Sequence, residues 1–497
     1  MPCASLIEAD LTVVGAGAAG LYTALTAARE GARVALVSAT PLAQTASYWA
    51  QGGLAAALAA EDSPERHLRD TITAGRGSAR PSAVRVLCAE APARVLELEQ
   101  LGVRFDADSR GRLALGLEGG HGARRVVHAG GSETGRRVTR ELSASVARDD
   151  RVVVLERCRA AALWTVDARC IGLVDDQGNA IRSGAVVLAA GGAAALWSRT
   201  TNPPGATGAA LLLALDAGAA LADLELLQFH PTAIVDPRRP GPGGRRRRSV
   251  EGFLVTEAIR GEGAVLLDDA GERFVDELAP RDEVARAIAA RLRETGAKAV
   301  GLDVSGVDPG RFPNVFGALR DAGIDPAREP VPVAPAAHYL MGGVATDLHG
   351  RTDVAGLYAV GECACTGLHG ANRLASNSLT ECFVFGRRAA LAALDEPPPR
   401  AAAAPAPRED AAAAAQPGAE TRAALWEHAG LERDRAGLER LCADPYPLAR
   451  LIGASALARE ESRGAHRRRD FPKLDEGLDL QHTVTRAGAP PAFERWL

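Results

Sequence analysis

The chain has 497 residues, 47% of them hydrophobic, and carries a formal net charge of −4. This length exceeds what a single hydrophobic core usually supports, so we expect two or three domains. The slightly acidic balance argues against nucleic acid or an anionic membrane as the main partner.

The N-terminus lacks the basic segment that opens a signal peptide, and no apolar run reaches the roughly 18–20 residues of a membrane span. The eight cysteines are scattered and form no Cys-x-x-Cys pair, which fits reduced thiols better than disulfides or a zinc site. We therefore expect a soluble, cytoplasmic protein without a bound metal.

The first predicted strand, Leu11–Val14, runs directly into a glycine-rich turn, and a predicted helix (21–30) and a second strand (34–37) follow. This is the context of the dinucleotide fingerprint, in which glycines permit a tight turn and a close approach to a pyrophosphate. The helix N-terminus adds backbone N–H donors for the phosphates. The residues expected to hold the pyrophosphate are Gly15, Ala16, Gly17, Ala18, Ala19 and Gly20.

The second strand ends in Ser38-Ala39-Thr40. A site for NAD needs an acidic residue about 20 positions beyond the glycines to hold the ribose. Neither Asp nor Glu stands there, so the sequence favours a flavin over a nicotinamide cofactor.

Residues 117–130 read LEGGHGARRVVHAG and place one acid, Glu118, in a glycine-rich and otherwise basic loop. Glycines here leave room for a ligand or another backbone to approach closely. Two interpretations stay open on these residues alone. Glu118 either serves a ligand or is a surface residue paired with Arg124 or Arg125.

Two further apolar runs, AVVLAAGG (185–192) and GLYAVGE (356–362), together with the first strand predict one doubly wound sheet interrupted by an insertion. The Pro/Gly/Arg stretch at 237–249 predicts an exposed loop rather than a nucleic-acid site. Leucines at helical spacing in 419–469 predict a helical bundle. We expect a nucleotide-binding domain (1–223 and 340–395), a capping domain (224–339), a linker (396–418) and a C-terminal helical domain (419–497).

Several blocks, in this order, resemble the succinate dehydrogenase/fumarate reductase flavoprotein family over residues 10 to about 390. They are TASYWAQGG (45–53), QFHPT (228–232), TEAIRGEG (256–263), RDEVAR (281–286), HYLMGG (338–343) and GLHGANRLASNS (367–378). The C-terminal ESRGAH (461–466) is similar to the family's third domain. The resemblance implies an α/β fold, with a Rossmann-like FAD-binding domain, an inserted α+β capping domain and a C-terminal helical bundle.

Within this family the chain looks most like members that oxidise L-aspartate to iminoaspartate, the first step of quinolinate and NAD synthesis. The resemblance implies O2 or fumarate as the electron acceptor and quinolinate synthase as a candidate partner. It also implies non-covalent FAD, because Ala46 stands where succinate dehydrogenases carry the histidine that is bonded to the flavin.

The resemblance assigns roles to individual residues. Arg281 would transfer the proton opposite the flavin, and Glu118 would position the substrate amino group. Arg373 suits a carboxylate because its planar guanidinium matches the two oxygens. The remaining residues expected to bind the substrate are His230, Thr256, Glu257, His338 and Ser376.

The flavin would lie along the second glycine-rich block, with Glu362 bonding its ribityl or ribose hydroxyls and a helix start facing its carbonyl end. The residues expected here are Ser38, Ala46, Ser47, Tyr48, Trp49, Ala50, Gln51, Gly52, Gly53, Glu362, Ser378 and Leu379. One departure is Ala209, where the family usually has the Asp of Thr-Gly-Asp-Gly. If that Asp anchors FAD, flavin affinity or redox potential should differ here.

Two other functions stay open at this point. One is a soluble fumarate reductase or related dicarboxylate dehydrogenase, which Glu118 disfavours because a carboxylate would repel a substrate without an amine. The other is a flavin-binding subunit without activity, supported only by Ala209 and opposed by the site residues that the chain retains.

Overall fold

The computed structural model describes residues 6–42, 44–236, 250–398 and 416–497. Its central sheet has five parallel strands in the order β18-β11-β2-β3-β7. These strands are β2 (Leu11–Val14), β3 (Val34–Ser38), β7 (Val152–Glu156), β11 (Ala185–Leu188) and β18 (Leu357–Ala359). The expected doubly wound arrangement is therefore present, and β7 is an edge strand that the sequence did not predict.

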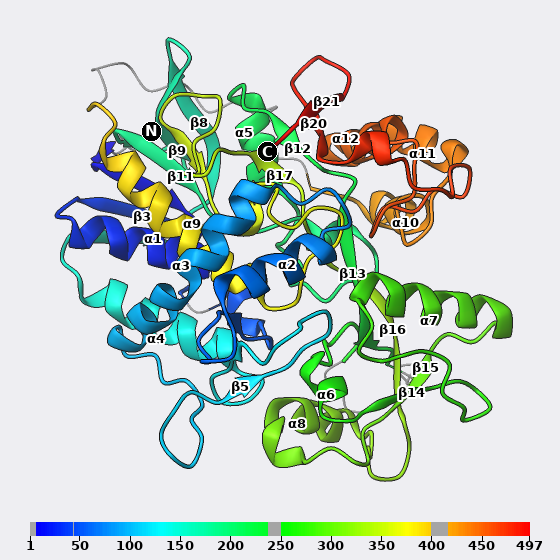
Figure 1. The fold of residues 1–497 in the computed structure, drawn as a ribbon. Helices are drawn as coiled ribbons and strands as arrows, with labels where there is room; N and C mark the ends of the chain where they lie inside the picture. Colours follow the sequence, from blue (N-terminus) through cyan, green and yellow to red (C-terminus); the bar gives the residue numbers. More distant parts are fainter. Residues whose placement is uncertain (1–5, 43, 237–249, 399–415) are drawn as a thin grey trace, which may run out of the picture.

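Helix α1 (Ala18–Arg29) packs against α9 (Asn377–Leu394) and α4 (Thr134–Arg148) beside this sheet (Figure 1). It begins at Ala18 rather than at 21, because the last residues of the glycine-rich turn already belong to its first turn. Two further helices, α2 (Pro64–Ala74) and α3 (Pro81–Gln100), pack against each other, and α3 also contacts α9. A four-stranded sheet is formed by β1 (Leu6–Glu8), β8 (Ala160–Val166), β9 (Arg169–Asp175) and β10 (Ala180–Arg182).

A small antiparallel sheet holds the acidic loop singled out in the sequence. Strand β5 (Leu115–Gly116) pairs with β6 (Val126–Val127), so residues 117–125 form the loop between them. Strand β6 also pairs with β4 (Leu54–Ala55), which directly follows Gly53. The pairing therefore brings the loop beside the second glycine-rich block.

The insertion is an α+β unit with its own hydrophobic core, drawn in green at the lower right of Figure 1. Its antiparallel sheet has the order β13-β16-β15-β14, and the described part of the insertion adds three α-helices. The elements are β13 (Leu227–Ile234), α6 (Ala258–Gly261), β14 (Val265–Leu267), α7 (Arg281–Thr295), β15 (Val300–Asp303), α8 (Pro313–Ala322) and β16 (Val331–Leu340).

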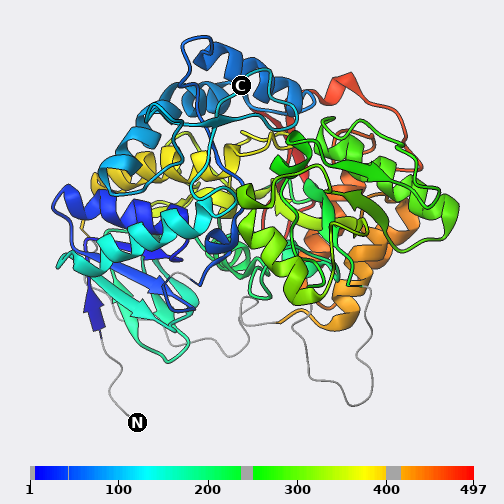
Figure 2. The same ribbon diagram turned by 90° about the horizontal axis from the view of Figure 1, so that it is seen from below.

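The C-terminal region contains the predicted helices as α10 (Ala419–His428), α11 (Arg435–Cys442) and α12 (Pro447–Ala458). A hairpin that the sequence did not predict, β20 (Gln481–Thr485) and β21 (Ala492–Arg495), follows them. It extends a sheet made by β12 (Leu221–Ala222), β17 (Gly343–Ala345) and β19 (Ala364–Cys365), and α5 (Ala209–Asp216) precedes β12. The C-terminus ends beside α3, where the Leu497 carbonyl accepts a hydrogen bond from Arg80 at 3.3 Å (Figure 2).

Across the described residues, no helix combines the length and the hydropathy that crossing a membrane requires. The predicted loop at 237–249 and most of the predicted linker at 396–418 lie outside the described residues. The domain boundaries themselves stay predictions.

Candidate active site

The first glycine-rich turn leaves no room for side chains at two of its positions. A Cβ atom on Gly15 would lie 2.3 Å from the carbonyl oxygen of Ala189, and Gly15 has a φ of +113°. A Cβ atom on Gly20 would lie 1.8 Å from the carbonyl oxygen of Gly15. The turn therefore requires glycine, and it aims the N-terminus of α1 at the carboxyl edge of the sheet, where α/β folds bind phosphates.

The second glycine-rich block crosses this edge. The Ala18 N–H donates a hydrogen bond to Ser47 Oγ at 3.1 Å, which joins the two blocks. None of the residues Ala46–Trp49 is buried, and Trp49 is 56% exposed. Gln51 Nε2 donates to the Leu254 carbonyl at 2.7 Å, whereas its buried Oε1 has no partner within the described part of the chain.

Glu362 follows strand β18 at the same edge, and its Oε1 accepts a hydrogen bond from the Leu340 N–H at 3.0 Å. Burial raises the pKa of Glu362 to about 7. An open strip of backbone beside a carboxyl group fits a cofactor with a flat ring and a hydroxylated chain, as FAD has.

Two other positions considered for the flavin are Ser38 and Ala209. Ser38 Oγ donates to the Thr40 carbonyl at 2.6 Å. Helix α5 starts at Ala209, where the family usually has Asp, and it has no side-chain cap.

Arg373 lies buried, 4% exposed, just before α9. Its Nη1 donates to Ser378 Oγ at 3.0 Å, its guanidinium stacks 4.6 Å from the Tyr339 ring, and its Nε has no partner among the described residues. Burial first, and then repulsion by Arg281, lowers the pKa of Arg373 to about 10. Two buried guanidinium groups that repel each other are stabilised by an anion bound between them.

His230 and His338 lie together, with ring centroids 5.1 Å apart. Burial, followed by the nearby arginines, lowers the pKa of both imidazoles well below the usual value, so both are neutral at pH 7. The Thr232 N–H donates to His230 Nδ1 at 3.3 Å, which leaves the ring proton on Nε2. His230 Nε2 can therefore donate a hydrogen bond to a carboxylate.

Arg281 is the first residue of α7, and it is buried rather than on the surface. Its Nε donates to Glu257 Oε2, and its Nη1 donates to Gln228 Oε1 at 3.2 Å. The carboxylate of Glu257, which the sequence analysis expects at the substrate, thus holds the Arg281 guanidinium. Thr256 is also buried, 3% exposed.

Arg260 completes this charged cluster, and sequence reasoning missed it. Its Nη2 lies 3.6 Å from Glu257 Oε1, and its side chain is fully buried. Although burial opposes ionisation, Arg281 and Arg260 together hold the pKa of Glu257 below its usual range. The available signal was its place in the TEAIRGEG block, three residues after Glu257.

Glu118 is 2% exposed, so the interpretation as a surface residue is wrong. Arg124 is exposed, and Arg125 pairs with Asp62 and Asp70 instead. Glu118 Oε2 accepts a hydrogen bond from Ser376 Oγ at 2.7 Å. Its Oε1 lies 3.7 Å from His128 Nε2 and has no hydrogen-bond partner in the described ranges.

A cavity of about 50 Å³ brings the loop of Glu118 together with both arginines. Its lining residues are Asp70, Thr73, Ala74, Arg76, Gly119, Gly120, Pro280, Arg281, Asn372, Arg373, Leu374 and Ala375. Glu118, whose buried carboxylate has an unpartnered oxygen, thus directly precedes two lining residues of a cavity that three arginines also line. This arrangement suits a small molecule that carries both an ammonium group and carboxylates.

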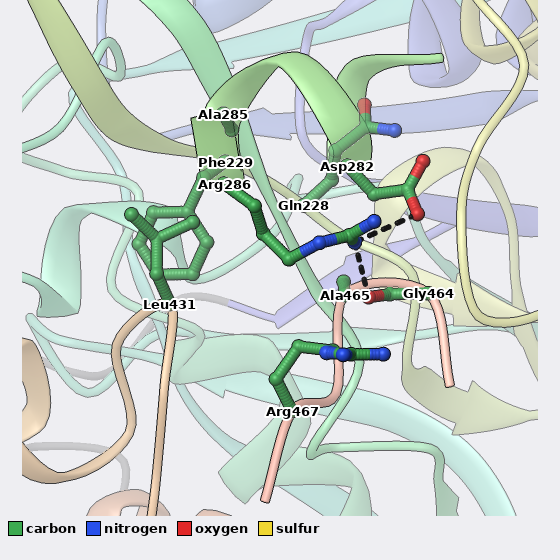
Figure 3. A pocket seen from close by; sticks show the side chains of 9 residues that line it. All are labelled: Gln228, Phe229, Asp282, Ala285, Arg286, Leu431, Gly464, Ala465 and Arg467. Atoms are coloured by element: carbon green, nitrogen blue, oxygen red, sulfur yellow. Dashed lines mark hydrogen bonds and ion pairs between the residues drawn. The ribbon is translucent and has the colours of Figure 1, made fainter. Parts of the chain in front are cut away.

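A second, smaller cavity of about 10 Å³ lies between α7, β13 and the C-terminal segment, and Figure 3 shows its lining. Here Arg286 donates to Asp282 at 3.0 Å and to the Gly464 carbonyl at 3.5 Å. Because Arg286 pairs with Asp282 and neither Arg281 nor Arg373 lines it, we assign this cavity to the support of α7.

Comparisons with known proteins agree with this geometry. Residues 10–379 match the FAD binding domain model, and residues 443–494 match the fumarate reductase flavoprotein C-terminal model. The chain is 45% identical to an L-aspartate oxidase of Caulobacter vibrioides over 97% of both chains. It is 44% identical to that of Agrobacterium fabrum, covering 97% of this chain and 96% of the relative.

Among solved structures, the chain is similar to a mutant FrdA of E. coli quinol fumarate reductase. The TM-score is 0.86 at 28% identity, covering 99% of this chain and 96% of the other. The fold is thus shared with fumarate reductase flavoproteins, whereas the higher sequence identity is to the oxidases. The chain belongs to the L-aspartate oxidase family of FAD-binding flavoproteins.

Proposed function

We propose that this chain oxidises L-aspartate to iminoaspartate at a non-covalently bound FAD. One observation carries the proposal: Glu118, whose buried Oε1 has no hydrogen-bond partner among the described residues, directly precedes Gly119 and Gly120, which line a cavity together with Arg281 and Arg373. The relatives named L-aspartate oxidase support the substrate.

Bound FAD would accept the hydride from the substrate α-carbon. The pyrophosphate would lie over the residues from Gly15 to Gly20, where the turn leaves backbone exposed to it. Ser47 to Gly53 would follow the ring and the ribityl chain, and Glu362 would accept hydrogen bonds from its hydroxyls. The N-terminus of α9, with Ser378 and Leu379 in its first turn, would face the carbonyl end of the ring.

The cations would hold the two carboxylates of the substrate. Arg373 offers its unpartnered Nε as a donor, and His230 and His338, whose rings lie side by side, would donate imidazole N–H groups to a carboxylate. Glu118 would accept hydrogen bonds from the α-ammonium group through Oε1. These contacts fix the α-carbon in one orientation, which selects an amino dicarboxylate over a plain one.

We propose Arg281 for the proton transfer opposite the flavin. Glu257 and Gln228 hold its guanidinium by two hydrogen bonds, so the group is oriented before the substrate arrives. Burial of this cluster excludes water from the proton-transfer site.

A second candidate function is fumarate reduction by the same site, which the similarity to fumarate reductase flavoproteins supports. The two functions use the same arginines and differ at Glu118. For the oxidase we propose O2 or fumarate as the electron acceptor and quinolinate synthase as the enzyme that takes the product.

The seven described cysteines are free, which supports a reducing compartment such as the cytoplasm.

Turnover tests the proposal directly. Purified holoenzyme should consume O2 and form hydrogen peroxide when L-aspartate is added, and oxaloacetate and ammonia should appear as the imine hydrolyses. Anaerobically, fumarate should replace O2 and yield succinate. Failure of L-aspartate to support either reaction, with a normal flavin spectrum, would contradict the proposed function.

A further inference from the structure

The loop that carries Glu118 is fastened to helix α2 by a buried ion pair. Arg125 is 0% exposed, and its Nε and Nη2 donate to the two oxygens of Asp62 at 2.8 and 2.9 Å. Its Nη1 bonds Asp70, whose Oδ2 also accepts the Gly122 N–H at 2.8 Å. The loop is therefore held at Gly122 and at Arg125, which both follow His121 in the chain.

Arg125 also decides where His121 carries its proton. Its Nη1 lies 3.2 Å from His121 Nδ1, and a guanidinium group can only donate hydrogen bonds. Nδ1 must therefore accept, and the ring proton lies on Nε2. That proton is donated to the Ala375 carbonyl at 2.9 Å. Burial lowers the pKa of His121, so the ring keeps this neutral form at pH 7.

The Ala375 carbonyl belongs to the peptide that precedes Ser376, and this serine has a φ of +60°. The left-handed conformation is uncommon for residues other than glycine, so neighbouring bonds must hold it. Ser376 Oγ accepts the Gly53 N–H at 3.1 Å and donates to Glu118 Oε2 at 2.7 Å. Arg125 and His121 are thus connected to Glu118 through hydrogen bonds on either side of the peptide that joins Ala375 to Ser376.

We propose that His121 is a positioning residue for amine recognition. By donating to the Ala375 carbonyl, His121 fixes the orientation of the Ser376 hydroxyl. That hydroxyl holds Oε2 of Glu118, so that Oε1 is directed at the substrate ammonium group. This inference rests on the proposed function and adds a specificity-determining residue to it.

A neighbouring contact shows that the start of α9 does not depend on His121 alone. His67 Nε2 lies 2.8 Å from Asn377 Oδ1, and Asn377 Nδ2 donates to Thr71 Oγ1 at 3.1 Å. Helix α2 therefore holds Asn377 by separate bonds. Replacing His121 should leave α9 in place and disturb mainly the peptide between Ala375 and Ser376.

The test is a double-mutant cycle on the FAD-loaded enzyme, using His121→Leu and Glu118→Gln singly and together. The readout is kcat/KM for L-aspartate oxidation, and the rate of fumarate reduction is measured on the same preparations. We expect His121→Leu to lower kcat/KM for L-aspartate about tenfold, the loss of one buried hydrogen bond. The same change in the Glu118→Gln background should cost less than twofold.

His121→Gln supplies a side-chain N–H at the position of Nε2, so it should recover most of the loss. Arg124→Leu removes an exposed charge from the same loop and should behave as wild type. Flavin absorbance and thermal unfolding of each variant report whether it is folded. If His121→Leu does not fold, His121→Gln and His121→Asn, which places its amide at the position of Nδ1, give the same comparison.

An equal loss from His121→Leu in both backgrounds, or an equal loss of L-aspartate oxidation and fumarate reduction, would overturn the inference. Either result would mean that His121 supports the fold rather than Glu118. Failure of the wild-type enzyme to oxidise L-aspartate would instead contradict the proposed function, so the two failures are distinguishable.

Discussion

Glu118→Gln removes the negative charge from the proposed ammonium site and almost nothing else. Glutamine has the same shape, and its side-chain oxygen can still accept the hydrogen bond from Ser376 Oγ. Because Glu118 is 2% exposed and its Oε1 has no partner within the described ranges, water does not replace the lost interaction.

A hydrogen bond between charged groups contributes about 1.5–3 kcal/mol. At about 1.36 kcal/mol per factor of ten, kcat/KM for L-aspartate should fall about 10- to 150-fold. Fumarate carries no ammonium group, so the rate of its reduction by the same variant should fall less than about threefold.

The assay is anaerobic stopped-flow reduction of the flavin by L-aspartate, followed by reoxidation of the reduced enzyme with fumarate. The matched control is Glu30→Gln, which neutralises an exposed glutamate at the end of α1 and should leave both rates unchanged. Equal losses in the two half-reactions would refute the reasoning, because they would make Glu118 a residue of the scaffold.

Three further outcomes follow from the geometry. Arg281→Leu should abolish L-aspartate turnover at saturating substrate while FAD stays bound, and near-normal turnover measured by oxygen uptake would rule out the proton-transfer role. Burial raises the pKa of Glu362 to about 7, so FAD affinity, titrated by fluorescence on apoprotein, should rise as the pH increases through 7, since the carboxylate is the better acceptor. Glu362→Gln should make that affinity independent of pH. Burial lowers the pKa of His67 to about 3 against 6.5 unfolded, so its contribution to stability is complete above pH 6.5 and is lost as the pH falls towards 3. His67→Gln should reduce the slope of unfolding free energy, measured in urea between pH 6 and 4, by about 1.4 kcal/mol per pH unit, and an unchanged slope would show that His67 is not the group responsible.

Three of the five parallel strands of the central sheet were predictable because strands buried on both faces are continuous apolar runs, and each of the three is followed by a glycine-containing turn. Strands β2, β11 and β18 all have this pattern. Strand β7 has exposed positions within it and lies at the sheet edge, so its sequence carries a weaker signal. The β20–β21 hairpin is short and largely polar, and its first strand is buried through pairing with β12, far away in the sequence.

The residues of the site also include some features that the sequence indicated and others that it did not. Glycine blocks and unusual His and Arg residues indicated which side chains to examine, but not their partners. The contacts of Arg125 with Asp62 and Asp70, and of Arg281 with Glu257, join segments whose separation in the chain follows no fixed spacing. Arg260 is different, because it lies three residues after Glu257, one helical turn away, so this pair was within reach of sequence reasoning.

The most direct test of the account compares substrates on the oxidised holoenzyme without oxygen. L-aspartate, D-aspartate and succinate are each mixed with the enzyme, and bleaching of the flavin absorbance is followed. We predict rapid bleaching by L-aspartate and little or none by D-aspartate and succinate. Bleaching by succinate but not by L-aspartate would contradict the central claim that Glu118 and the two arginines select an amino dicarboxylate.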